Sequence, residues 1–101
     1  MKENIRAIVK EPGKDPKWVW HPNTLKGLQE TVGGYIEVVE IFSDVVIICN
    51  EEGLINALPY NCTLFGHQLF GTILIAGVDG AEFDDAPLAA MKTIFGGGAE
   101  E

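Results

Sequence analysis

The alternation of apolar and polar residues predicts a first strand near the N-terminus and a hairpin in the middle of the chain. Residues 5–10 alternate in this way, and the turn-forming residues 11–14 end the strand. Residues 35–42 and 45–50 are rich in β-branched side chains and are separated by two residues, so we expect an antiparallel hairpin. The run 45–50 is apolar on both faces, which is typical of a central strand.

Two further strands are expected in the second half of the chain. Residues 54–58 predict a short strand and residues 69–78 a long one, with a loop at 59–63 before the long strand. Residues 15–22 contain a proline near each end and predict a short extended piece that carries both tryptophans on the same side.

Two helices are predicted from the spacing of apolar residues. Asn23 is the expected N-cap of the first helix, which has apolar residues at i, i+3 and i+7 and ends at residues 33–34, two glycines. The second helix is expected to begin at the acids 84–85, with Pro87 in its first turn, and to end at the glycines 96–98.

These elements follow the order β, α, β, β, β, β, α. That order predicts an α+β fold in which two short helices cover one side of a small mixed, mainly antiparallel sheet. We expect a single domain over residues 1–98 and a frayed tail at 99–101. Two short helices leave part of such a sheet uncovered, so we also expect a homo-oligomer.

The chain of 101 residues carries a net charge of -8. This charge argues against a nucleic-acid groove, because such grooves neutralise phosphates with Lys and Arg. Residues 1–26 hold six cations and three acids, a balance of +3, whereas residues 27–101 hold one cation and twelve acids, a balance of -11. The asymmetry favours a small anion bound by the N-terminal third, a head-to-tail contact between identical subunits, or charges that are simply solvated.

Location and thiol chemistry follow from the apolar runs and the cysteines. The longest apolar run covers residues 45–49, far short of the roughly 20 residues needed to cross a bilayer, and the N-terminus lacks the apolar stretch of a signal peptide. We therefore expect a cytoplasmic protein with no membrane partner. Cys49 and Cys62 lack CxxC spacing, so we expect free thiols, with Cys49 in the core.

No familiar catalytic motif is present in the sequence. The only serine, Ser43, lies in a predicted turn, and neither histidine belongs to a nucleophile motif, which leaves a pair formed in space, such as Cys62 with His67, as the alternative. Turn and N-cap roles explain the acid pairs 51–52 and 84–85, and the acids around the second pair lack EF-hand spacing. We predict a binding protein and not an enzyme, with no metal and no cofactor.

Aromatic, amide and cationic side chains supply the parts of a pocket for a nucleobase and a phosphate. Rings would stack on the base, amides would contact the base or ribose, and cations would hold the phosphate. The competing interpretation is structural, because aromatic residues normally lie in cores and asparagines after strands normally lie in turns. The candidate ligand-binding residues are Arg6, Lys14, Lys17, Trp18, Trp20, His21, Tyr35, Asn50 and Asn61.

A series of short blocks extends along nearly the whole chain. The most specific are Gly-Gly-Tyr-Ile-Glu at residues 33–37 and Asn-Glu-Glu-Gly at residues 50–53. In this combination the sequence resembles a family of small domains of unknown function (DUF) from Gram-positive bacteria, their phages and mobile elements. The resemblance carries no catalytic or ligand-binding residues with it, and it implies a setting in phage or mobile DNA.

In the setting that this resemblance implies, small non-enzymatic proteins often act against host defence. We therefore expect a homo-oligomeric anti-defence sponge that sequesters a nucleotide-derived immune signal without cleaving it. The alternative is an acidic interaction module that binds a host protein, like a DNA mimic or an anti-restriction protein. This alternative depends on the charges of Glu30, Glu37, Glu40, Asp44, Glu51 and Glu52.

Overall fold

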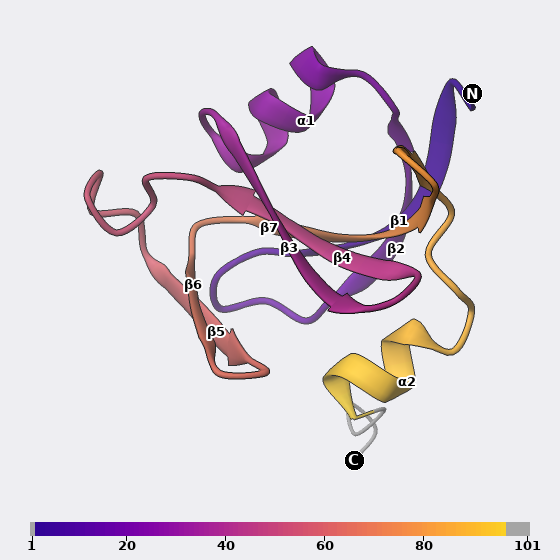
Figure 1. The fold of residues 1–101 in the computed structure, drawn as a ribbon. Coiled ribbons are helices and arrows are strands. Elements are labelled where there is room, and N and C mark those ends of the chain that lie inside the picture. Colours follow the sequence, from indigo (N-terminus) through magenta and orange to yellow (C-terminus); the bar gives the residue numbers. More distant parts are fainter. Residues whose placement is uncertain (1, 97–101) are drawn as a thin grey trace.

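A six-stranded antiparallel sheet forms the centre of the computed structural model, which describes residues 2–96 (Figure 1). A separate two-stranded sheet consists of β5 (Tyr60–Leu64) and β6 (His67–Phe70). The predicted α+β fold with an antiparallel sheet and two helices is confirmed. The main sheet has the order β2 (Lys17–Pro22), β1 (Asn4–Lys10), β7 (Ile73–Asp79), β4 (Val45–Asn50) and β3 (Ile36–Phe42), and β8 (Glu82–Asp84) pairs with the end of β7.

Strands β4 and β7 are buried on both faces, which makes the main sheet the middle layer of the fold. All six residues of β4 are buried, and residues 73–76 of β7 are fully buried. Because successive side chains of a strand point to opposite faces, both strands contribute to two separate apolar clusters. Each face of the sheet therefore needs its own cover.

Helix α1 (Leu25–Val32) covers one face, where its Leu28 and Val32 pack into the cluster that contains Ile48 and Leu74. The opposite face is covered by the β5–β6 hairpin and by α2 (Ala90–Phe95), as Figure 1 shows. The prediction that both helices lie on one side of the sheet is therefore wrong. Neither described helix has the length and apolar character needed to span a membrane.

Several strand predictions are also wrong. Residues 54–58 form a turn stabilised by backbone hydrogen bonds, including one of 2.8 Å from the Asn56 N–H to the Glu52 oxygen. The expected loop 59–63 contains most of β5. The single strand predicted at 69–78 is two strands that are separated at Gly71, whose φ of +79° redirects the chain.

Both predicted helix starts are shifted. Thr24 caps α1 by accepting a hydrogen bond of 3.0 Å from the backbone N–H of Gly27, whereas the Asn23 side chain donates to the backbone oxygen of Lys2. The acids 84–85 lie five residues or more before α2. Asp85 instead accepts a hydrogen bond from the backbone N–H of Arg6 in β1 and forms an ion pair with Lys2. The predicted frayed tail, 99–101, lies outside the described residues.

Gly77 of β7 should be intolerant of a side chain, because a Cβ atom there would overlap the backbone oxygen of Asp85. We expect Gly77→Ala to lower the free energy of unfolding by about 3 kcal/mol, measured by urea denaturation. Gly13→Ala is the control: nothing lies near its Cβ position, and its φ of +77° implies a cost of about 1 kcal/mol. A Gly77→Ala variant as stable as the control would contradict this steric argument.

Candidate functional site

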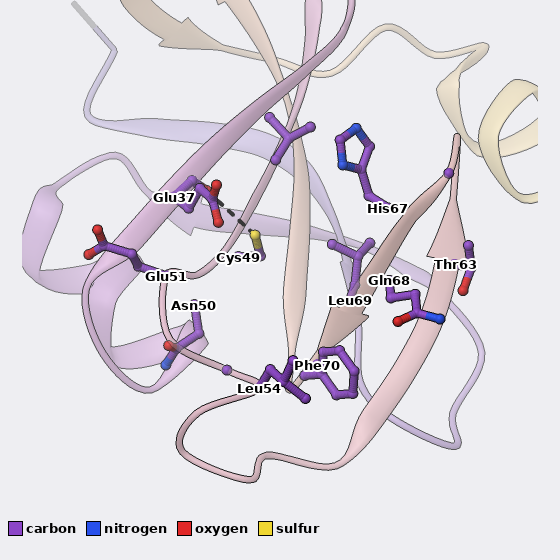
Figure 2. Close-up of a pocket in the computed structure, with 13 residues that line it drawn as sticks. Glu37, Cys49, Asn50, Glu51, Leu54, Thr63, His67, Gln68, Leu69 and Phe70 are labelled. Carbon is purple, nitrogen blue, oxygen red and sulfur yellow. Dashed lines mark hydrogen bonds between the residues drawn. The ribbon is translucent and has the colours of Figure 1, made fainter.

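A groove of about 540 Å³ lies between β3–β4 of the main sheet and the β5–β6 hairpin (Figure 2). Its volume falls within the range of roughly 300–1,000 Å³ that is usual for small-molecule sites. Figure 2 shows Glu37, Cys49 and Glu51 on one side of the groove and Thr63, His67, Gln68 and Phe70 on the other.

Local backbone geometry determines the shape of this groove. The hairpin reverses through Phe65 and Gly66, whose φ angles of 50° and 82° match a two-residue turn with both central residues in the left-handed region. At the other end, Gly53 lies against Phe70, and a Cβ on residue 53 would be 3.1 Å from the Phe70 backbone oxygen. The missing side chain at residue 53 thus lets the turn after β4 approach β6.

Two polar side chains of the hairpin wall, which consists of Thr63 and residues 66–70, are available for a ligand. His67 and Gln68 are exposed, and within residues 2–96 their side chains make no hydrogen bond to the protein. A glutamine amide both donates and accepts hydrogen bonds, and Phe70 adds an apolar ring. The wall therefore combines an aromatic surface with unengaged polar groups.

The charge of the groove is negative. Glu37 and Glu51 line it, and no Lys or Arg is among its lining residues. Carboxylates repel a phosphate group at close range, and they attract cations. The groove itself therefore favours neutral or cationic groups over phosphates.

Cys49 lies in the groove wall, but its thiol is not activated. Its Sγ donates to the backbone oxygen of Glu37 at 3.7 Å. Burial, with a smaller effect of the Glu37 charge, raises the pKa of Cys49 from 9.0 to about 11, and burial also raises the pKa of Cys62. Both cysteines are free, as expected. Although His67 lines the same groove as Cys49, a neutral thiol is a poor nucleophile.

The described residues contain no cluster of three or more His, Cys, Asp or Glu side chains suited to a metal ion. The acids of the predicted interaction surface are spread over several elements. Glu30 is in α1, Glu37 and Glu40 are in β3, and the remaining three are in turns, namely Asp44, Glu51 and Glu52.

The structure does not gather the predicted ligand-binding residues into one pocket. Arg6 and Trp18 come together, with the guanidinium carbon 5.7 Å from the centre of the Trp18 ring. Trp20 lies on the same face of β2 and is 69% exposed. Lys17, at the start of β2, is also exposed.

Three predicted site residues are buried and bonded to their own chain. His21 contacts the Thr31 hydroxyl at 2.6 Å through Nε2. Asn61 donates through Nδ2 to two backbone oxygens, each at 2.8 Å, and thereby links the hairpin to the end of β1. Asn50 donates to the Val32 oxygen at 3.1 Å and accepts from the backbone N–H of Glu52 at 2.7 Å.

A smaller pocket of about 280 Å³ adjoins the groove at Asn50. It contains Tyr35, which is 70% exposed, together with Gln29, Asn56 and Glu52. Of the predicted site residues, Asn50 alone lines the large groove, and Tyr35 shares the smaller pocket with it. The side chains that the sequence missed, His67, Gln68 and Phe70, belong to the hairpin that was not predicted.

Two of the cations that were expected to bind phosphate are paired with acids of the same chain. Lys14 contacts Glu11 at 3.1 Å. Arg6 donates to the backbone oxygen of Ala86 at 3.0 Å and lies 3.9 Å from an Asp85 carboxylate oxygen. Arg6 thus connects β1 to the segment after β8, whereas the Lys14 pair is a local contact within one turn.

A model of a domain of unknown function, DUF3846, matches residues 5–97. This chain belongs to the DUF3846 family. The predicted resemblance to a family of small domains of unknown function is thereby confirmed, and the matched range includes every residue of the groove. The DUF3846 chain matches no curated protein and no solved structure.

The Cys49 thiol of this DUF3846 chain should react slowly. A pKa of about 11 lowers the thiolate fraction near neutral pH roughly 100-fold relative to a thiol at 9.0, so in a Cys62→Ser variant we expect alkylation by iodoacetamide to slow by about that factor. The control is the same variant in urea, which should react at the ordinary rate. Similar rates for the folded and unfolded variant would contradict an unactivated thiol.

The acids 84–85 should make stability sensitive to acid. Bonds from Lys2 and from the Asp85 N–H lower the pKa of Asp84, and bonds from the Arg6 N–H and Lys2 lower the pKa of Asp85, both below 3.8. Their contribution is complete above pH 3.8 and is lost as pH falls through the lowered pKa values. We expect Asp84→Asn/Asp85→Asn to show a smaller acid-induced fall in melting temperature than wild type, and parallel curves would exclude this contribution.

Proposed function

We propose that this chain is a non-catalytic binding protein that holds a small polar molecule in the groove between β3–β4 and the β5–β6 hairpin. The observation that carries the proposal is the hairpin wall, where Gln68 offers an unengaged amide on the same strand face as the Phe70 ring, and His67 adds a second unengaged polar group. The raised pKa of the Cys49 thiol supports binding without covalent chemistry.

The ligand class that we propose is a nucleotide-derived molecule, and its base is the part that suits the groove. A base has a flat apolar face for Phe70 and an edge of donors and acceptors that a glutamine amide can pair with. The phosphates would lie outside the groove, because Glu37 and Glu51 would repel them. This arrangement replaces the expected phosphate site at Arg6, Lys14 and Lys17.

The biological role in this proposal is sequestration of a nucleotide-derived immune signal in the cytoplasm of a host cell by a phage or mobile-element protein. It is supported by the resemblance described above and by a groove without an activated nucleophile. A homo-oligomeric state belongs to the same proposal, and light scattering after size-exclusion chromatography measures it directly.

Calorimetric titration with nucleosides, nucleotides and cyclic dinucleotides tests the groove. We expect Gln68→Ala to weaken binding by about tenfold, the effect of losing one or two hydrogen bonds. Glu37→Gln/Glu51→Gln should strengthen binding of a nucleotide more than binding of its nucleoside. The ligand should be recovered intact.

Gln29→Ala is the matched control, because it removes the same amide from the smaller pocket. If Gln29→Ala weakened binding and Gln68→Ala did not, the ligand site would be the smaller pocket and the proposed groove would be wrong. Absence of binding by every nucleoside and nucleotide would remove the nucleotide-derived ligand class.

A further inference from the structure

Strand β3 is an open edge of the main sheet. It pairs with β4 on one side and has no described strand on the other. The Tyr35 backbone oxygen accepts a hydrogen bond of 2.8 Å from the Glu51 N–H, so these two residues form a hydrogen-bonded pair. From Tyr35 to Glu40, successive residues of β3 direct their backbone groups alternately toward β4 and away from it. The backbone N–H and C=O groups of Ile36, Val38 and Glu40 therefore point away from β4.

The β3 edge lacks lysine and proline, two features that usually protect a free edge. The edge at the other end of the sheet, β2, has Lys17 at its start and Pro22 at its end. Strand β3 contains neither lysine nor proline, its pairing with β4 is regular up to Glu40, and Val38 is 42% exposed. Lysines and prolines are common devices against strand addition, so their absence leaves β3 open to pairing.

The charge of the β3 edge determines which kind of strand can bind there. Glu37 and Glu40 are exposed and have no ion pair with any residue in 2–96. A second copy added antiparallel with Val38 opposite Val38, where the outward backbone groups match, would place Glu37 diagonal to the Glu37 of the copy on the same face of the sheet, and like charges this close repel. Two chains of net charge -8 also repel each other at a distance. The occupant must therefore be basic.

We propose that the free edge of β3 binds an extended segment of a partner protein by strand addition, and that this segment carries Lys or Arg at positions i and i+3. Glu37 and Glu40 are three residues apart and so point to opposite faces of the sheet. Residues opposite them on an added strand have the same spacing. Backbone hydrogen bonds supply affinity in this mode of recognition, and the two ion pairs supply selectivity.

The backbone groups of this edge lie outside the ligand groove, because they belong to the outward side of β3, although the Glu37 side chain also lines the groove. A suitable probe is the peptide acetyl-Thr-Lys-Val-Val-Lys-Thr-amide, added to the full chain labelled with nitrogen-15. We expect saturable shifts of the amide signals of Ile36, Val38 and Glu40. The affinity should fall several-fold when salt is raised from about 20 to about 300 mM. The peptide with Glu in place of both Lys residues should produce none of these shifts.

Two variants distinguish the contribution of the backbone hydrogen bonds to peptide binding from that of the ion pairs. In Val38→Pro, the lost N–H is one that points outward, so peptide binding should disappear while the pairing with β4 is retained. Glu37→Gln/Glu40→Gln should raise the dissociation constant by about fivefold or more, whereas Glu30→Gln/Glu52→Gln, with the same change in net charge, should leave it within about twofold.

Three results would overturn the proposal. One is equal binding of the acidic and the basic peptide, and another is an unchanged dissociation constant in Glu37→Gln/Glu40→Gln. The third is a concentration-dependent shift of the same three amides without peptide, because a second copy would then occupy the edge. Binding of nucleosides is measured separately, so failure of one proposal leaves the other intact.

Discussion

Burial of β4 and β7 on both faces is the constraint from which the rest of the fold follows. Each fully buried Ile, Leu or Val side chain contributes about 1.5–3 kcal/mol relative to an exposed one, so neither face of the sheet can remain in water. Helix α1 covers one face, and the β5–β6 hairpin with α2 covers the other. The groove is the place where this second cover diverges from β3 and β4, so the candidate site is a by-product of covering the sheet.

The sequence predicts the elements whose signals are local. The run at 45–50 and the two-residue link before it predict the β3–β4 hairpin, and the glycines 33–34 predict the end of α1. The β5–β6 hairpin was missed because its turn has Phe65 at a positive φ, where Asn, Asp or Gly is usual. The Phe65 ring lies edge-on to Phe42, with centroids 5.4 Å apart, and this long-range contact has no local sequence signal.

The residues of the candidate site were predicted less well than the elements of the fold, because here too the decisive contacts are long-range. Residue type identifies side chains that are able to bind, but only the tertiary structure shows which of them are already engaged. Asn50 lies beside the groove, yet its amide holds the end of α1 and the turn after β4. Arg6 is joined to an acid 79 positions away, and the pairing cancels the positive charge on which a phosphate site would depend.

The hairpin wall has a dynamic consequence. Strands β5 and β6 form their own sheet, and apolar side chains and the Asn61 amide attach it to the rest of the fold. A hairpin of two strands has little stability of its own, so this unit opens at a smaller free energy than the whole domain unfolds. A molecule that contacted both walls of the groove would join the two sheets, and its binding would slow hydrogen exchange in the hairpin.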